Sequence, residues 1–191
     1  IKEIIKLSKT QKLIVLKSTV PIGTNRRIVD LLNTYRSKFN HDVVSNPEFL
    51  REGSAINDFM LPDRVIIGIN SEKAKEVMSK IYKPLYLRDF PIMYTDPESA
   101  ETIKYASNAF LATKISFINE IAHLCEKTGA DVKQVAKGMG LDKRIGDKFL
   151  HAGPGYGGSC FPKDTLALTK VGRELGANQS IVETVIKVNT A

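Results

Sequence analysis

Residues 12–45, KLIVLKSTVPIGTNRRIVDLLNTYRSKFNHDVVS, decide the fold class of this chain. The stretch begins with an aliphatic run, Leu13–Lys17, and ends with a second short run, Asp42–Ser45. Between the two runs, apolar residues recur at helical spacing from Ile28 to Tyr35. A strand, a helix and a strand in this order are typical of a βαβ unit, whose two strands lie parallel in one sheet.

The same alternation continues on both sides of this stretch. A helical pattern opens the chain, and further strands are predicted over Val65–Ile69 and Ile92–Tyr94. A helix that begins after Ser71 is expected between them, because Ser is a favourable N-cap residue. The sequence therefore predicts an α/β fold, with part of a doubly wound parallel sheet in a first domain of residues 1–95.

A long helix follows the predicted sheet. Asp96 and Pro97 are a favourable N-cap and first helical residue, and the helical pattern ends only at Gly129. Apolar side chains cover about half of its circumference, which is too much to bury against one neighbour. We expect a central helix shared with a second subunit, in an all-α domain of residues 96–191. Further helices are predicted over Asp131–Met139, Lys163–Leu175 and Ser180–Val188.

Composition excludes several function classes. The 191 residues include 28 Lys and Arg and 21 Asp and Glu, a net charge of +7, and 42% are hydrophobic. No run approaches the ~18 apolar residues of a membrane-spanning helix, so no membrane partner is expected. The basic residues are scattered, which argues against a nucleic-acid partner. Two cysteines are too few for a disulfide framework, so we expect a cytoplasmic protein. The three histidines have no partners at metal-ligand spacing, and we predict no metal site.

A glycine-rich loop precedes the helix predicted after Pro162. Residues 153–164 read GPGYGGSCFPKD, and three of the glycines match the spacing G-x-G-x-x-G. That motif binds dinucleotides only where it leaves a strand and enters a helix of a βαβ unit. Here it lies among helices and contains Pro154, so we reject the dinucleotide interpretation.

Cys160 lies where this loop enters the helix. Backbone donors and the positive end of the helix would favour a thiolate, and Lys163 would add to the effect. We therefore treat Cys160 as a candidate nucleophile. The alternative is a small buried hydrophobic residue, which is how we interpret Cys125 within the long apolar helix.

Lys104 and Asn108 are spaced i, i+4 on the long helix and so share one of its faces. A cation and an amide donor held rigidly together are suited to stabilising an oxyanion. Asp164 is expected to pair with either Lys104 or Lys163. The alternative for Lys104 and Asn108 is a solvated helix surface.

Two loops follow the first two predicted strands, Ser18–Pro21 and Asn46–Gly53. Ligands of open α/β sheets bind beyond the carboxyl ends of the strands, where both loops are expected. The second loop carries two carboxylates, an arginine and an aromatic ring, which suit base catalysis and ligand contact. An ordinary turn at Asn46-Pro47 is the alternative.

Taken together, these segments resemble the UDP-glucose 6-dehydrogenase family of nucleotide-sugar dehydrogenases. The similarity covers nearly the whole chain, but not the family's phosphate-binding glycine fingerprint or its C-terminal domain. It implies the C-terminal half of a Rossmann-like NAD-binding domain, followed by a central dimerisation domain, and a chain that is inactive alone. The motifs that match, in the family's order, are STVP at 18–21, NPEFLREG at 46–53, PDR at 62–64, residues 101–108, and GGSCFPKD at 157–164.

The resemblance implies an NAD-dependent, two-step oxidation of UDP-glucose at C6 to UDP-glucuronate. Cys160 matches the nucleophile that forms a thiohemiacetal and then a thioester. The remaining catalytic positions match Lys104, Asn108 and Asp164, for the oxyanion, protons and ordered water, and Glu48 and Thr19, for the hydrolytic water and the C6 end.

The resemblance also implies binding residues and a homodimer formed through the long helix. Cofactor contacts match Thr19, Glu52 and Lys163. Arg144 matches an arginine offered across the dimer interface. Substrate contacts match Glu48, Phe49, Leu50, Arg51, Lys104, Asn108, Arg144, Phe149 and Gly157.

Other functions remain open from the sequence. GDP-mannose 6-dehydrogenase shares the cysteine mechanism, although RIGDKFL at 144–150 is more similar to the UDP-glucose branch. A β-hydroxyacid dehydrogenase also uses a Lys and an Asn on a central helix but needs no cysteine. Outside enzymes, the alternatives are a nucleotide-sugar-binding and dimerisation module without catalysis, and a basic nucleic-acid binder.

Overall fold

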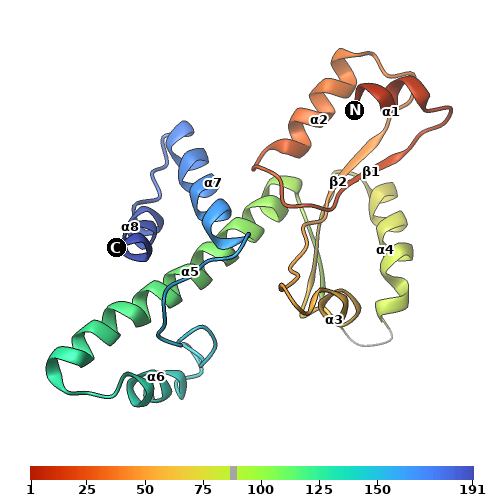
Figure 1. Cartoon of the computed structure of the whole chain (residues 1–191). Helices are drawn as coiled ribbons and strands as arrows, with labels where there is room; N and C mark the ends of the chain where they lie inside the picture. Colours follow the sequence, from red (N-terminus) through yellow and green to blue (C-terminus); the bar gives the residue numbers. More distant parts are fainter. Residues whose placement is uncertain (87–89) are drawn as a thin grey trace. The chain divides into compact units, whose positions relative to one another are not determined.

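The computed structural model describes residues 1–86 and 90–191. Two compact units make up the chain, Ile1–Lys104 and Tyr105–Ala191 (Figure 1). They divide within helix α5 (Pro97–Thr128), a few residues after the start of the helix. The domain boundary predicted between residues 95 and 96 stays a prediction.

The first unit alternates strands and helices, and the predicted α/β class is confirmed. The predicted strands agree with the observed ones to within one residue at each end. A short helix between the second and third strands was not predicted. In chain order the elements are α1 (Lys2–Leu7), β1 (Leu13–Leu16), α2 (Thr24–Thr34), β2 (Asp42–Ser45), α3 (Ala55–Met60), β3 (Val65–Gly68), α4 (Glu72–Tyr86) and β4 (Ile92–Thr95).

The four-stranded sheet has the order β1-β2-β3-β4, and it departs from the predicted parallel arrangement at one pairing. β1 and β2 are parallel, as are β3 and β4, but β2 and β3 are antiparallel. A parallel neighbour requires a crossover, usually a helix that packs on the sheet. The six-residue α3 leaves the apolar side chains of Ile56, Phe59 and Met60 exposed. It does not cover the sheet, and the chain returns in the opposite direction.

This antiparallel pairing brings the carboxyl ends of the strands together. Leu16 pairs with Ser45, Ser45 with Gly68, and Gly68 with Thr95, so the last residues of all four strands form one row. The first turn of α5 packs against this row. A Cβ on Gly68 would lie 2.6 Å from the Cα of Pro97, so only glycine allows this close approach.

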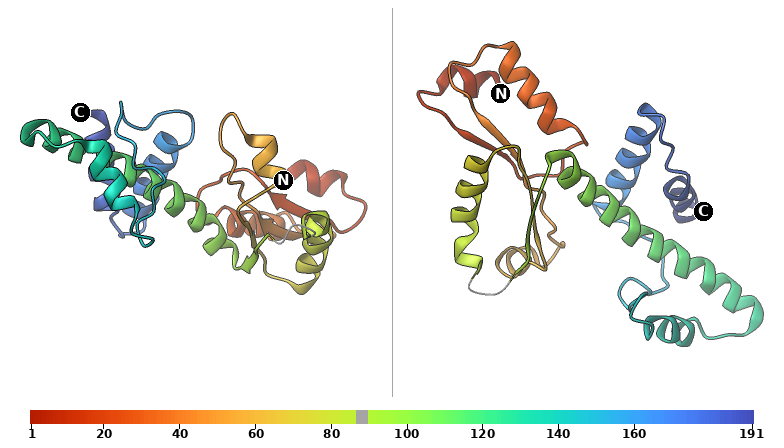
Figure 2. Two further views of the ribbon diagram at one scale, coloured as in Figure 1. Left: turned by 90° about the horizontal axis from the view of Figure 1, so that it is seen from below. Right: turned by 180° about the vertical axis from the view of Figure 1, so that it is seen from behind.

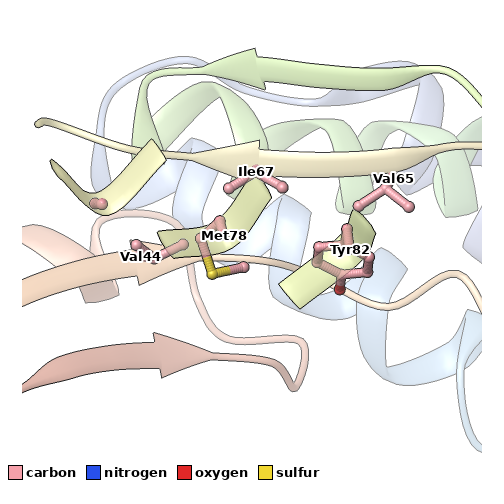
Figure 3. Packing of buried hydrophobic residues seen from close by; sticks show 6 residues of the cluster. Val44, Val65, Ile67, Met78 and Tyr82 are labelled. Carbon is pink, nitrogen blue, oxygen red and sulfur yellow. The ribbon is translucent and has the colours of Figure 1, made fainter. Parts of the chain in front are cut away.

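Helices cover both faces of the sheet (Figures 1 and 2). On one face, Met78 and Tyr82 of α4 pack against strand residues that include Val44 and Ile67 (Figure 3). On the other face, helix α2 packs against Val43. Successive residues of a strand point to opposite faces, so Val43 and Val44 divide the core between the two layers. Full burial of each large apolar side chain contributes about 1.5–3 kcal/mol.

The second unit is helical, as predicted. Beyond Lys104 it contains the rest of α5, then α6 (Val132–Gly140), α7 (Phe161–Glu174) and α8 (Ser180–Thr190). Asp131 caps α6 by accepting a hydrogen bond from the backbone of Lys133 at 2.8 Å. The Asp96 side chain caps the start of α5 in the same way, through Ser99 N at 2.7 Å. Among the described residues, no helix combines the length and apolar character needed to cross a bilayer.

Candidate functional site

Glu48 is the centre of a polar cluster beyond the carboxyl ends of β1 and β2. Its Oε1 accepts a hydrogen bond from Thr19 Oγ1 at 3.4 Å and lies 3.5 Å from Lys104 Nζ. Its Oε2 accepts a hydrogen bond from Leu50 N at 2.7 Å. Lys104 is only 3% exposed, so its charge is balanced by Glu48 rather than by water. The structure thus brings together three predicted catalytic residues, Thr19, Glu48 and Lys104, and pairs Lys104 with Glu48 rather than with Asp164.

Phe49 forms the wall of this cluster. The Lys104 ammonium lies 5.2 Å from the centre of its ring, and the Arg64 guanidinium lies 4.0 Å from it. A cation over an aromatic face is attracted by the ring's quadrupole, so both contacts hold the ring in place. The sequence pointed to Phe49 and to the motif that contains Arg64, but no local pattern connected the two residues.

Lys17, at the end of the first predicted strand, belongs to the same cluster and was missed. Its Nζ donates a hydrogen bond to Asn46 O at 3.3 Å. Burial lowers the pKa of the Lys17 ammonium group, the Glu48 carboxylate opposes that shift, and the positive charge of Lys104 adds to it. A lysine that ends an apolar strand usually lies in solvent, so no sequence pattern distinguishes Lys17 from a surface lysine.

Arg51 is held by α3. Its Nη2 lies 2.5 Å from Asp58 Oδ1, and its Nε donates a hydrogen bond to Asp58 Oδ2 at 3.0 Å. These contacts and the hydrogen bond from Arg51 N keep the pKa of the Asp58 carboxyl well below its usual range. The Arg51 side chain is nevertheless 70% exposed. Glu52, predicted as a cofactor contact, is exposed in the next position.

Glu101, the first residue of the matching segment 101–108, is a buried carboxylate for which the sequence predicts no role. It accepts hydrogen bonds from Gly23 N at 2.6 Å, Asn25 N at 3.0 Å and Ser45 Oγ at 2.9 Å. A negative charge at the positive end of a helix is stabilising, and here it caps α2. Glu101 thereby connects α5, α2 and the end of β2, and fixes the start of the helix that carries Lys104.

Two recesses flank the Glu48 cluster. The larger lies under the loop after β2 and is lined by residues that include Lys17, Phe49 and Arg64. The smaller is lined by the loop after β1, Pro47, Glu101 and Lys104. The smaller recess lies at the row of strand ends, where open α/β sheets bind dinucleotides, so its residues fit part of a cofactor site.

A second cluster lies within the helical unit. Asn108 Nδ2 donates a hydrogen bond to Asp164 Oδ2 at 2.6 Å, and Lys163 Nζ lies 2.5 Å from Asp164 Oδ1. Asp164 is only 1% exposed, and each of its oxygens has a partner. Of the two lysines left open as partners, Asp164 pairs with Lys163.

Cys160 is the N-cap residue of α7 and is half-buried. Its carbonyl accepts a hydrogen bond from Asp164 N at 3.0 Å, which begins the helix. Its Sγ lies 3.7 Å from Ser159 Oγ. Cys125, in contrast, is 5% exposed and packs in the core. Cys125 is thus a buried residue, as expected, whereas the role of Cys160 as a nucleophile stays a prediction.

The other predicted substrate residues of the helical unit surround the loop before Cys160. Phe149 has a positive φ of 65° and contacts the Phe161 ring edge-on, with 6.2 Å between ring centres. Gly157 is exposed. Arg144 is 89% exposed, and its guanidinium donates hydrogen bonds to both carboxylate oxygens of Asp142, as arginine commonly does with carboxylates. Within residues 1–86 and 90–191, no three His, Cys, Asp or Glu side chains are grouped to hold a metal ion.

The comparisons with known proteins cover both units. Residues 1–86 match a family model described as the NAD binding domain of the UDP-glucose/GDP-mannose dehydrogenase family. Residues 98–191 match the model of that family's central domain.

Curated relatives point in the same direction. The UDP-glucose 6-dehydrogenase of Rhizobium meliloti (strain 1021) is 56% identical over 178 residues, which are 92% of this chain and 41% of the relative. The enzyme of the same name from Rickettsia bellii (strain RML369-C) is 54% identical over 177 residues, 93% of this chain and 40% of the relative. The chain thus spans about two fifths of the length of these relatives.

Solved structures share the fold. A UDP-glucose dehydrogenase from the hyperthermophilic archaeon Pyrobaculum islandicum has a TM-score of 0.89 and 46% identity, over 95% of this chain and 42% of that one. A GDP-mannose dehydrogenase from Pseudomonas aeruginosa has a TM-score of 0.64 and 32% identity, over 96% of this chain and 43% of that one. Two models of one family match nearly all of the sequence, and this chain therefore belongs to the UDP-glucose/GDP-mannose dehydrogenase family.

Proposed function

We propose that the intact protein is an NAD-dependent UDP-glucose 6-dehydrogenase that oxidises the C6 hydroxymethyl group to a carboxylate in two steps. The observation that carries this proposal is the placement of Cys160, half-buried at the start of α7 and one turn before the buried Asp164. The identity to enzymes of that name supports UDP-glucose over GDP-mannose. NAD, when bound, accepts a hydride in each step. Thr19, Glu52 and Lys163 are the residues that we assign to the cofactor side.

In the first step the alcohol loses a hydride and a proton and becomes an aldehyde. Lys104 and Asn108 would donate hydrogen bonds to the C6 oxygen and stabilise its developing negative charge. Asp164 keeps the Asn108 amide oriented through the 2.6 Å hydrogen bond. An ordered water next to Asp164 would carry the proton away.

In the second step Cys160 Sγ forms a bond to C6 of the aldehyde. The product is a thiohemiacetal whose former carbonyl oxygen carries the negative charge. Loss of the second hydride gives a thioester. Glu48, held by Thr19 and Leu50, then takes a proton from the attacking water, whose oxygen becomes part of the carboxylate. The C–S bond breaks and the thiol is regenerated.

The Phe49 ring contacts two cations, Lys104 and Arg64. We assign Phe49, Leu50 and Arg51 to binding of the sugar and the diphosphate. Arginine is suited to phosphate because its planar donors bind two oxygens at once. On the helical unit we assign Phe149, Gly157 and, from a second subunit, Arg144.

We also propose a homodimer formed through α5. Phe110, Phe117 and Leu124 are spaced by seven residues along this helix, and their side chains are 66%, 45% and 58% exposed. Such a stripe of large apolar side chains is typical of a helix that packs against another. Exposed Ile181 of α8 borders the groove beside Phe117.

We also propose that the protein acts in the cytoplasm. A free, catalytic thiol requires reducing conditions, which favours that compartment.

The assay that tests this function supplies the intact protein with NAD and either UDP-glucose or GDP-mannose. We expect two molecules of NADH for each UDP-glucose consumed, a carboxylate product, and at least a tenfold preference in kcat/KM for UDP-glucose. A preference for GDP-mannose would contradict the substrate. A single NADH with an aldehyde product would contradict the two-step chemistry, and salt-dependent binding of duplex DNA without any NADH formation would favour the nucleic-acid alternative.

A further inference from the structure

We propose that Asn189 of α8 is a positioning residue for Cys160, because it anchors the glycine-rich loop from which the cysteine follows. The inference rests on the proposed function, which makes Cys160 the nucleophile. Asn189 Oδ1 accepts a hydrogen bond from Tyr156 N at 2.7 Å, and its Nδ2 donates one to Tyr156 O at 3.0 Å. One amide side chain thus satisfies both backbone groups of Tyr156, as a neighbouring strand would.

Gly155 allows this contact. Its φ is +104°, and a Cβ at this position would lie 2.6 Å from Asn189 Oδ1. Any other residue would push the Asn189 side chain away from Tyr156. Gly155 is one of the three glycines that match the dinucleotide-binding spacing in the sequence. Here the glycine is required by the close approach of α8 and not by a dinucleotide.

The anchor extends to both ends of the segment that carries the nucleophile. The Tyr156 ring is buried and packs edge-on against Phe161, with 6.1 Å between the ring centres. Phe161 is the first residue of α7 and directly follows Cys160. Residues 157–160 therefore lie between Tyr156 and Phe161, whose rings pack against each other.

The two glycines of that segment contribute no side-chain contacts. Gly157 and Gly158 have no side chains, and Gly158 adopts a φ of +72° that few other residues tolerate. At the loop's other end, Asn119 Oδ1 of α5 accepts a hydrogen bond from Gly153 N at 2.9 Å. The location of Cys160 Sγ therefore depends on contacts made by the neighbouring residues, which include the double contact of Asn189 with Tyr156.

The test replaces Asn189 with Ala in the intact protein and follows Cys160 in two ways. First, the rate at which iodoacetamide alkylates Cys160 is measured at pH 7 by peptide mass spectrometry. We expect at least a threefold slower reaction, because the sulfur loses its fixed place at the positive end of α7. Second, oxidation of the UDP-linked C6 aldehyde should slow at least tenfold, whereas KM for UDP-glucose should change less than threefold. Oxidation of the alcohol, which needs no thiol, should slow less than oxidation of the aldehyde.

Matched variants separate positioning from a merely structural role. Lys187→Ala, at an exposed position of the same helix, should leave both measurements unchanged. Asn119→Ala removes one hydrogen bond instead of two and should have the same effects to a smaller extent, so it serves if Asn189→Ala does not fold. Unchanged alkylation of Cys160, or equal slowing of both oxidation steps, would overturn the proposal. Slower alkylation of Cys160 in a protein that oxidises no sugar would support the role of Asn189 in positioning the cysteine but would refute the proposed function.

Discussion

Replacing Cys160 with Ser is expected to lower kcat for the conversion of UDP-glucose to UDP-glucuronate by about 10³-fold or more. A serine hydroxyl is far less ionised than a thiol near neutral pH, so the aldehyde would not be captured and no thioester would form. The half-buried position at the start of α7 leaves the side chain accessible, so the substitution should not unfold the protein. NADH formation and the thermal unfolding temperature are the measurements.

Cys125→Ala is the matched control for this substitution. Cys125 is buried among apolar residues of α5 and plays no part in the proposed chemistry. Its replacement removes a thiol but keeps a small apolar side chain, so kcat should stay within threefold of the original protein. If Cys160→Ser also turned over at an undiminished rate, covalent catalysis would be ruled out, and the β-hydroxyacid dehydrogenase type of mechanism would gain support.

Replacing Lys104 with Ala should lower kcat by about 10²–10³-fold, which is the usual effect of removing one oxyanion donor. The ammonium lies 3.5 Å from Glu48 and is almost fully buried, so no water-exposed cation can take its place. Its loss would also leave Glu48 without its ion-pair partner and would remove one of the two cations that contact the Phe49 ring. Steady-state kinetics with UDP-glucose measure the effect.

Two further variants interpret the Lys104 result. Lys127→Ala, on an exposed part of the same helix, should change kcat less than twofold. Lys104→Arg keeps the charge but replaces a compact ammonium with a planar fork, so we expect it to restore little activity. Near-normal turnover of Lys104→Ala in a folded protein would show that the Glu48 and Lys104 pair is only structural.

Much of the fold could be predicted because its signals are local. The Asp96-Pro97 pair marks the start of α5, and the aliphatic runs mark the strands to within a residue. The antiparallel pairing of β2 with β3 could not be predicted, because it depends on what covers the sheet rather than on any local pattern. Helix α3 was missed for a related reason: it is short, and the Arg51–Asp58 contacts that accompany it involve no apolar periodicity.

The candidate site likewise contains some residues that the sequence could predict and others that it could not. Thr19 and Glu48 follow neighbouring parallel strands, so the general rule for strand ends places them together. Lys17, Glu101 and Asn189 act through contacts with residues 29 or more positions away in the chain. No spacing in one sequence encodes such contacts. The partner of Asp164 stayed open for the same reason until the structure paired it with Lys163.

The most direct test of the account is to look for the covalent intermediate on Cys160. In a Glu48→Gln variant the water that hydrolyses the thioester lacks its base, so the intermediate should accumulate when UDP-glucose and NAD are added. Acid quenching and peptide mass spectrometry should then find one UDP-glucuronyl group on Cys160, removable by hydroxylamine. NADH formation with Cys160 unmodified, or with the sugar attached to another residue, would contradict the account.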